Sequence, residues 1–392
     1  MRQFLEGSMA VAKAVGLSRP HVICAYPITP QTHIVEDLAQ MVADGELKSE
    51  FINVESEFAA ASVCLGASAA GSRSYTATSS QGLLLMAEVI FNIAGLRLPV
   101  ILTCANRAVS APLSIWNDHQ DSLAVRDAGW IQIYVENNQE CADAHIQAFK
   151  IAEDRRVMLP VMVCMDGFLL THSFEPVDIP SHEEADKFLP PYKPLHYLDP
   201  KNPMTFGSFA EPDKYMEARV ALHKAIEESD QVIVEVARDF ERKFGRFYGD
   251  LIEKYEMQDA EIVLVAMGSI LGTIKDVVDE LRAQGRKVGC LKIRTYRPFP
   301  IKAIREALLP IPRVIVLDKD ISMGAGGILA HEVRSALYSA PKRPEVGNLI
   351  IGLGGRDVSK ETIRNIFERC SREIPELDFV DLDVQLMEGA IR

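Results

Sequence analysis

The feature of this sequence that most constrains its fold is the alternation of short β-branched runs with segments of helical period. A buried strand needs only about 4–8 apolar residues, whereas a helix needs a longer segment with period 3.6. Strands that alternate with helices in this way predict an α/β fold, a parallel sheet with helices on both faces. The predicted strands are residues 21–25, 51–54, 74–78, 100–104, 130–135 and 161–165, and the first predicted helices are residues 31–44 and 56–70.

A proline-rich stretch interrupts this pattern. Seven of the 21 prolines lie between Pro176 and Pro203. Because proline cannot donate to a ladder of hydrogen bonds, the stretch predicts an extended arm over about residues 176–210. A connecting helix is predicted over residues 211–255, with an interruption around residues 245–249.

The strand pattern then restarts, which indicates a second α/β domain. Its predicted strands are residues 261–267, 287–293, 313–318 and 346–351. We therefore predict a first domain over residues 1–257, which includes the arm and the connecting helix. A second domain is predicted over residues 258–392.

Charge and hydropathy exclude two classes of protein. The chain has 55 Asp and Glu against 42 Lys and Arg, a net charge of −13. Binding to a phosphate backbone relies on clustered cations, so we expect no nucleic-acid partner. The longest apolar runs have the length of a strand, far below the ~20 residues of a membrane span, so we expect no membrane. The first residues lack a secretion signal, which predicts a cytoplasmic protein.

The seven cysteines are widely spaced, and no two form a Cys-x-x-Cys pair. That spacing argues against a zinc site or an iron–sulfur cluster held by this chain, and we expect no metal ligands in it. Reduced, buried thiols are expected instead. Cys24 precedes an unusual loop, so a functional role stays open for it.

Two loops after predicted strands offer rigid polar groups. In residues 26–31, Tyr-Pro-Ile-Thr-Pro-Gln, two prolines flank an Ile-Thr pair. They would hold the backbone and the Thr29 hydroxyl at the edge where α/β sheets bind ligands. A turn that caps the next helix through Thr29 or Thr32 is the simpler interpretation. Glu55 and Glu57 open the following helix, where an acid also complements the helix dipole.

Two further loops carry hydrogen-bond donors and a cation. Residues 78–82, Thr-Ser-Ser-Gln-Gly, are rich in hydroxyls and amides, and Arg107 follows an apolar strand with no acidic residue close to it in sequence. Its charge is then available to an anionic ligand, and a salt bridge to a sequence-distant acid is the alternative. We expect the four loops to meet at one edge of the sheet, because parallel strands all end there.

Two glycine-rich segments, residues 324–327 and 352–355, also follow strands. Neither completes the Gly-x-Gly-x-x-Gly pattern of dinucleotide binding, and no Gly-Lys-Ser/Thr phosphate loop occurs in the sequence. Tight turns are the simpler interpretation of both.

Several motifs together resemble one family, the α subunits of the pyruvate:ferredoxin oxidoreductases, within the 2-oxoacid:ferredoxin oxidoreductases. The resemblance spans nearly the whole chain. It implies a thiamine diphosphate enzyme, with a pyrimidine-binding domain of Rossmann-like layers followed by a domain similar to the transketolase C-terminal domain. Besides the four loops above, it rests on Trp-Asn-Asp-His at 116–119, Arg-Asp-Ala-Gly-Trp-Ile-Gln at 126–132, Arg-Thr-Tyr-Arg-Pro-Phe-Pro at 294–300 and Gly-Leu-Gly-Gly-Arg-Asp at 352–357.

The resemblance implies that this chain holds only part of the active site. A β subunit would hold the diphosphate and Mg²⁺ through a Gly-Asp-Gly motif, of which Met-Asp-Gly at 165–167 lacks the leading glycine. Iron–sulfur clusters would lie in partner subunits, which include a γ subunit and a ferredoxin-like δ subunit. Coenzyme A would be a co-substrate and ferredoxin the electron acceptor, in a dimer of heteromers.

The resemblance also implies roles for single residues. Glu57, with Glu55 as the competing choice, matches the carboxylate that hydrogen-bonds the pyrimidine N1′ atom and favours the imino form that deprotonates the thiazolium carbon. Thr29 and Arg107 match the groups that bind the oxoacid carboxylate, and Thr29 favours a monocarboxylate. The implied cofactor-binding residues are Tyr26, Pro27, Ile28, Glu57, Ser80, Gln81 and Gly82.

The function predicted from these motifs is oxidative decarboxylation of pyruvate with coenzyme A, giving acetyl-CoA, CO₂ and reduced ferredoxin. The isolated chain should be inactive. One alternative is the same chemistry on a branched-chain or other 2-oxoacid. Others are a catalytically silent assembly subunit and a coenzyme A or nucleotide-binding module built on residues 324–327.

Overall fold

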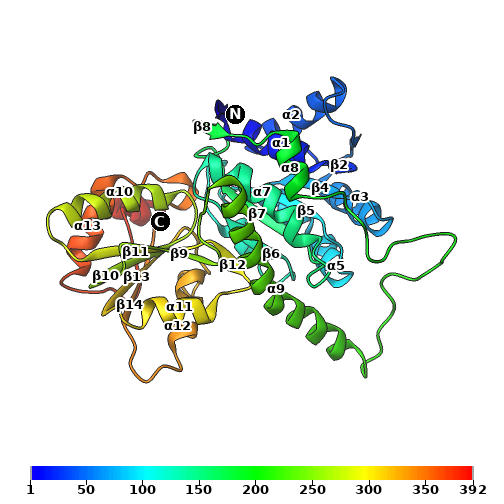
Figure 1. The fold of residues 1–392 in the computed structure, drawn as a ribbon. Coiled ribbons are helices and arrows are strands. Elements are labelled where there is room, and N and C mark those ends of the chain that lie inside the picture. Colours follow the sequence, from blue (N-terminus) through cyan, green and yellow to red (C-terminus); the bar gives the residue numbers. More distant parts are fainter. Residues whose placement is uncertain (1, 391–392) are drawn as a thin grey trace. The chain divides into compact units, whose positions relative to one another are not determined.

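The computed structural model describes residues 2–390 and divides the chain into two compact units (Figure 1). The first unit comprises Met1–Glu253 with Ile293–Pro300, and the second comprises Lys254–Lys292 with Ile301–Arg392. Each unit is built on a sheet in which parallel pairs dominate, flanked by helices. The α/β class predicted from the sequence is therefore confirmed.

The sheet of the first unit has seven strands in the order β12-β6-β7-β5-β4-β2-β3. Neighbouring strands are parallel except for β12, which runs antiparallel to β6. The six strands predicted for this part of the chain are all present. They are β2 (Val22–Cys24), β3 (Glu50–Ile52), β4 (Ser74–Thr78), β5 (Ile101–Asn106), β6 (Ile131–Tyr134) and β7 (Val161–Asp166), joined by β12 (Thr295–Arg297).

Helices cover both faces of this sheet. Alternate strand residues such as Ile23, Tyr75 and Ile133 point to one face and form a continuous core with α1 and α7. Small residues in α3 pack against β2 and β4, outside that core. The helices are α1 (Gly7–Ser18), α2 (Thr32–Ala43), α3 (Glu57–Ala69), α4 (Ser80–Leu85), α5 (Ala87–Gly95), α6 (Gln120–Ala124) and α7 (Asn138–Ala152).

The proline-rich stretch does not form one extended arm, so that prediction was wrong for residues 176–188. β8 (Phe174–Asp178) pairs antiparallel with β1 (Arg2–Glu6) in a two-stranded ribbon, where an edge position tolerates proline. α8 (His182–Phe188) follows, with Ser181 and Glu184 forming a capping box. The remaining residues, 189–214, form the arm, which loops away from the body of the unit in Figure 1.

The connecting helix is shorter than predicted. α9 (Tyr215–Phe244) ends at Gly245, whose φ of 69° places it in the left-handed region that terminates helices. Residues predicted to continue the helix instead form β9 (Ile252–Tyr255), an edge strand of the second sheet.

The segment Ile293–Pro300 belongs to the first unit, although its neighbours along the chain belong to the second. β12 extends the first sheet beside β6. Arg294 is completely buried and pairs with Glu140 at 3.0 Å, and its guanidinium also donates to Gln147 at 3.2 Å. A buried guanidinium is stable only with such partners, and Glu140 lies 154 residues away in sequence.

The second unit has a six-stranded sheet in the order β15-β14-β13-β10-β11-β9. α10 and α13 lie on one side of it and α11 and α12 on the other (Figure 1). Its other elements are β10 (Ile262–Ala266), α10 (Ile270–Ala283), β11 (Val288–Ile293), α11 (Ile301–Leu308), β13 (Arg313–Asp318), α12 (Ile328–Leu337), β14 (Glu345–Ile350), the short 3-10 turn η1 (Leu353–Gly355), α13 (Lys360–Cys370), β15 (Asp378–Phe379) and α14 (Val384–Ala390).

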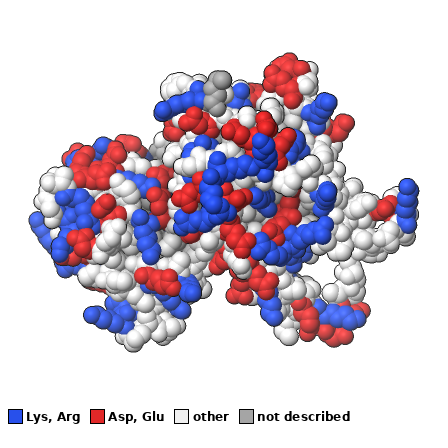
Figure 2. All heavy atoms as spheres, in the orientation of Figure 1, with Lys and Arg blue, Asp and Glu red and all other residues white. Residues whose placement is uncertain are grey.

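The distribution of charged side chains on the surface and the burial of the cysteines agree with what the composition predicts. Basic and acidic side chains are interspersed on the face shown in Figure 2. Among residues 2–390, no helix has both the length and the apolar character that crossing a membrane requires. All seven cysteines are buried thiols. Burial raises the pKa of Cys24 to about 11, which is the opposite of what a reactive thiolate needs.

Candidate active site

The four loops predicted to meet do lie side by side. They follow β5, β4, β2 and β3, which are consecutive neighbours in the sheet, and they leave it at the carboxyl ends of these parallel strands. Ser80 Oγ donates to the Ala108 carbonyl at 2.5 Å, and Arg107 Nη1 donates to the Thr29 carbonyl at 2.9 Å. These contacts join three of the four loops, those after β5, β4 and β2, into one cluster.

Glu57 is the first residue of α3 and is 8% exposed, whereas Glu55 is exposed. Ser56 caps the helix by accepting a hydrogen bond from the Ala59 amide at 3.2 Å. Within residues 2–390, no side chain or backbone group hydrogen-bonds or ion-pairs with the Glu57 carboxylate. A buried carboxylate without a partner is costly, so it marks a place where a ligand can donate a hydrogen bond.

Gly82 lies directly against this carboxylate. A Cβ atom added at Gly82 would sit 2.6 Å from Glu57 Oε1 and 2.6 Å from Thr78 Oγ1. The lack of a side chain at this position therefore allows α4 to approach α3 closely enough to enclose the Glu57 carboxylate. Both residues were predicted from the sequence to lie at the site, and Gly82 and Glu57 are in direct contact in the structure.

Other buried polar atoms beside Gly82 also lack partners. Thr78 Oγ1, Ser79 Oγ and Gln81 Nε2 make no hydrogen bond within the described part of the chain. Buried polar groups are normally satisfied, so several orphans in one loop indicate a polar ligand. Ser80 differs, because its hydroxyl donates to the Ala108 carbonyl, and Gln81 Oε1 lies 2.6 Å away as the alternative acceptor.

Arg107 is 7% exposed and holds two loops together. Its Nε donates to the Ser114 carbonyl at 3.1 Å, while Nη1 donates to the Thr29 carbonyl. No carboxylate of residues 2–390 forms an ion pair with it, so the predicted alternative of a distant salt bridge is absent from the described chain. Burial lowers the pKa of Arg107, and the charge of Asp121 opposes that shift.

Gln31 fixes the loop of residues 26–31 against β4. Its side-chain amide donates to the Ala77 carbonyl at 2.9 Å and its oxygen accepts from the Ile28 amide at 3.2 Å. Neither Thr29 nor Thr32 caps α2, whose N-terminal flanking residue is Gln31 without a side-chain cap. The capping interpretation was therefore wrong. Tyr26, Pro27 and Thr29 are exposed at the surface of this loop, and Ile28 is half-buried.

Sequence reasoning missed Asp121, which organises the centre of the cluster. This completely buried carboxylate accepts hydrogen bonds from the backbone amides of Ser80 at 2.9 Å and Arg107 at 3.0 Å, and from the Asn106 side chain at 2.8 Å. Burial raises the pKa of Asp121, and these hydrogen bonds oppose the rise. The only sequence signal was an acid at the start of α6, which is too common to single it out.

Asp166 and Trp130, which belong to two other sequence motifs, make hydrogen bonds in the interior of the first unit. Asp166, in the Met-Asp-Gly segment, pairs with His119 at 2.8 Å, and both side chains are buried. Trp130 donates its indole N–H to the Ile90 carbonyl at 2.8 Å. These contacts account for both residues as part of the core.

The backbone amides that follow the glycine-rich segment at residues 324–327 already bind carboxylates of this chain. Asp318 accepts from the amides of Leu329 and Ala330 at the N-terminus of α12, and Asp320 accepts from the Ile328 amide. A Cβ on Gly327 would overlap the Asp318 carboxylate. Because carboxylates already bind these amides, the segment is not arranged to receive a phosphate.

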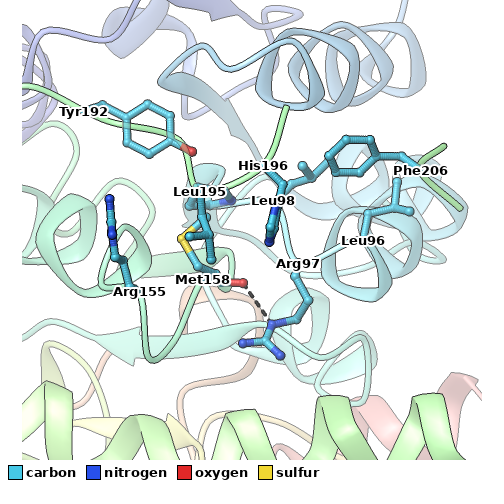
Figure 3. Close-up of a pocket in the computed structure, with 10 residues that line it drawn as sticks. Leu96, Arg97, Leu98, Arg155, Met158, Tyr192, Leu195, His196 and Phe206 are labelled. Atoms are coloured by element: carbon cyan, nitrogen blue, oxygen red, sulfur yellow. Dashed lines mark hydrogen bonds between the residues drawn. The ribbon is translucent and has the colours of Figure 1, made fainter. Parts of the chain in front are cut away.

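A separate cavity of about 230 Å³ lies at the opposite edge of the first sheet (Figure 3). It is bounded by the turns that precede β5 and β7 and by the arm, with Arg97 donating to the Met158 carbonyl at 3.0 Å. The amino ends of the strands form this edge, so the cavity is distinct from the cluster around Glu57.

Comparison with known proteins identifies the family. Residues 13–238 match the family model described as pyruvate flavodoxin/ferredoxin oxidoreductase, thiamine diphosphate-binding, and residues 260–363 match pyruvate:ferredoxin oxidoreductase core domain II. The chain is 52% identical over 390 residues to pyruvate synthase subunit PorA of Methanosarcina barkeri, covering 98% of this chain and 97% of that one. The chain belongs to the pyruvate:ferredoxin oxidoreductase family.

Proteins similar to this chain differ in the substrates that their names give. Ketoisovalerate oxidoreductase subunit VorA of Pyrococcus abyssi is 45% identical over 375 residues, covering 95% of this chain and 94% of that one. A solved 2-oxoglutarate:ferredoxin oxidoreductase from Magnetococcus marinus has the same fold, with a TM-score of 0.71 at 21% identity. That match covers 94% of this chain and 65% of the other.

Proposed function

We propose that this chain is the α subunit of a multi-subunit pyruvate:ferredoxin oxidoreductase, which converts pyruvate, coenzyme A and oxidised ferredoxin to acetyl-CoA, CO₂ and reduced ferredoxin. The observation that carries the proposal is that Glu57, whose carboxylate has no partner within residues 2–390, and Arg107 lie on loops at one edge of the sheet. Near-full-length similarity to pyruvate synthase subunits supports the named reaction.

The residues present fit the pyrimidine ring of thiamine diphosphate. A buried carboxylate without a partner accepts the hydrogen bond of a protonated ring nitrogen, and the orphan polar atoms of Thr78, Ser79 and Gln81 suit a ring with an amino group. When bound, the cofactor supplies the carbon nucleophile for the oxoacid carbonyl. Glu57 would accept the hydrogen bond of the ring nitrogen, with Gly82 packed directly against its carboxylate.

Arg107 and Thr29 are proposed to bind the oxoacid carboxylate. Two of the donors of the Arg107 guanidinium are fixed on backbone carbonyls, which orients the remaining N–H groups without an ion pair to neutralise the charge. The Thr29 hydroxyl lies on the same loop as the carbonyl that Arg107 binds. Such a clamp orients the substrate carbonyl for attack, and a single guanidinium suits a monocarboxylate.

A partner subunit is proposed to complete the site. Several large apolar side chains on its loops are exposed, which is unusual for a finished active site and typical of an interface. A β subunit would hold the diphosphate and Mg²⁺, and other partners would hold the iron–sulfur clusters and bind ferredoxin. The exposed side chains are Tyr26 (37%), Phe58 (41%), Leu85 (51%), Leu113 (72%) and Trp116 (51%).

The arm and the first turns of α9 are proposed as a second partner surface. Both segments expose large apolar side chains where the core of the unit cannot cover them. The exposed side chains are Leu195, Tyr197, Leu198, Met204, Phe209, Tyr215, Met216 and Val220.

The cytoplasm, a reducing compartment, is proposed as the location of the assembly. The seven buried thiols support this proposal.

The second candidate function is the same chemistry on a branched-chain 2-oxoacid. It is favoured by the 45% identity to a ketoisovalerate oxidoreductase subunit over almost the whole chain. The two candidates share Glu57 and Arg107, so these residues do not separate them.

Anaerobic co-purification followed by a dye-reduction assay tests the proposal. The assembly is assayed with pyruvate, 2-oxoisovalerate and 2-oxoglutarate, each with and without coenzyme A. We expect coenzyme-A-dependent reduction that is fastest with pyruvate. Faster reduction with 2-oxoisovalerate would establish the second candidate. No reduction by an assembly that contains thiamine diphosphate and clusters would instead indicate an assembly subunit.

A further inference from the structure

Three side chains from distant parts of the first unit meet beside the candidate active site. Glu6 ends β1, His33 lies in the first turn of α2, and His172 lies in the connection between β7 and β8. One ligand atom from each lies within 4.8 Å of the other two, and all three residues are half-buried. None of them has a role in the proposed function.

The backbone fixes two of these residues together. The amides of Gly7 and Ser8 donate to the carbonyls of Ser173 and Thr171, each at 3.1 Å, so Glu6 and His172 are carried by one hydrogen-bonded ribbon. His33 completes the group, with its Nδ1 atom 2.9 Å from Glu6 Oε1. Its ring contacts the His172 ring, with 4.6 Å between centroids and the two planes tilted by 34°.

The electrostatics of the cluster favour a cation. Asp37 lies one turn after His33 on α2, and burial together with the charge of Glu6 raises the pKa of Asp37 to about 6. The charged groups that act on Asp37 are the acids Glu6 and Glu36 and the bases His33 and Lys13, so with Asp37 itself three carboxyl groups lie against two basic side chains.

We propose that Glu6, His33 and His172 form a binding site for one divalent cation of the Zn²⁺ or Co²⁺ kind, with Asp37 as a further carboxylate nearby. Two imidazoles and a carboxylate are the donor set of such borderline cations, and three protein ligands leave a position for water. A tetrahedral site with bonds of about 2.1 Å places its ligand atoms about 3.4 Å apart. Small side-chain rotations therefore suffice to close the triad on an ion.

The site adjoins the substrate loops through a column of rings. His172 contacts Phe168 at 4.8 Å between centroids, and Phe168 contacts Trp116 at 4.5 Å. Trp116 lies two residues after Ser114, whose carbonyl holds Arg107. A bound ion would fix the β7–β8 connection against α2 and so support this loop. The metal-binding inference itself does not depend on the proposed function.

Metal titration of the full chain, first stripped with a chelator, tests the site. We expect one Co²⁺ per chain, with visible bands of nitrogen and oxygen ligation and without a thiolate charge-transfer band. Zn²⁺ should displace the Co²⁺ and raise the midpoint of thermal unfolding. His172→Ala and the isosteric Glu6→Gln should each weaken binding at least about tenfold.

His223→Ala is the matched control, because His223 is exposed on α9 next to Glu227 and should leave the titration unchanged. If His172→Ala fails to fold, Glu6→Gln decides, since it keeps the size and hydrogen-bonding reach of the side chain. Binding that is only millimolar, binding that Glu6→Gln leaves intact, or a thiolate band would each overturn the proposal.

Discussion

The substitution Gly82→Ala tests the arrangement of the candidate site most directly. Its Cβ would sit 2.6 Å from Glu57 Oε1, about 0.8 Å short of the 3.4 Å at which ordinary contact begins. The Glu57 carboxylate must therefore shift by about that distance, and Thr78 Oγ1 is equally close on the other side. A displacement of about 1 Å at a reacting group costs roughly 10²-fold in rate.

We expect Gly82→Ala to lower the turnover of the assembled enzyme about 100-fold and to weaken its affinity for thiamine diphosphate. The control is Gly66→Ala, on the same helix as Glu57, where an added Cβ meets nothing within 4 Å. Both substitutions gain the helix propensity of alanine, about 1 kcal/mol. Only Gly82→Ala loses energy to overpacking, about 1–3 kcal/mol, so unfolding by urea should show Gly66→Ala as the more stable variant.

Turnover of Gly82→Ala within twofold of the parent would refute this reasoning. It would mean that the Glu57 carboxylate tolerates a shift of this size, and hence that its position beside Gly82 is not used. Equal loss in Gly66→Ala would point to assembly of the complex rather than to the site.

Three further predictions concern single side chains. Glu57→Gln should reduce turnover by about 10²-fold or more with an unchanged unfolding midpoint, whereas near-normal turnover would remove Glu57 from the mechanism. Arg107→Lys keeps the charge but cannot hold both carbonyls and a carboxylate, so KM for the oxoacid should rise at least about tenfold with a smaller change in kcat; an unchanged KM would contradict the role. Burial raises the pKa of Asp230 to about 7, and the charge of Glu227 makes a smaller contribution in the same direction. The parent should therefore lose stability as pH rises from about 4 to 7, because the unfolded chain releases this proton first. Asp230→Asn should be more stable than the parent at pH 8, on the order of 1 kcal/mol after solvent screening, and the difference should vanish below pH 4 in urea unfolding. A difference that persists at pH 4 would rule out this cause.

Local pattern predicted the central strands of both sheets and the two helices that follow β2 and β3. The reason is that strands such as β5 and β7 are buried on both faces and read as continuous apolar runs, whatever their neighbours are. The four loops could also be predicted to meet, because consecutive carboxyl ends of parallel strands share one edge.

Segments held by partners far away in sequence could not be predicted. Pro176 lies in a strand because β1 pairs with β8. Residues 252–255 form a strand because they pair with β11 at the edge of the second sheet. Ile293–Pro300 joins the first unit because buried Arg294 needs Glu140. None of these partners is close in sequence, so local propensity carries no trace of them.

The sequence by itself determined the α/β class, the family and the residue types at the candidate site. Only the tertiary structure decided which of them meet: Glu57 is buried where Glu55 is exposed, Gly82 encloses its carboxylate, and Asp121 ties Ser80 to Arg107. It also gathered Glu6, His33 and His172, which are separated by 27 and 139 positions along the chain. Periodicity records which face of an element is buried, but burial and contact of a polar side chain depend on the elements that pack around it.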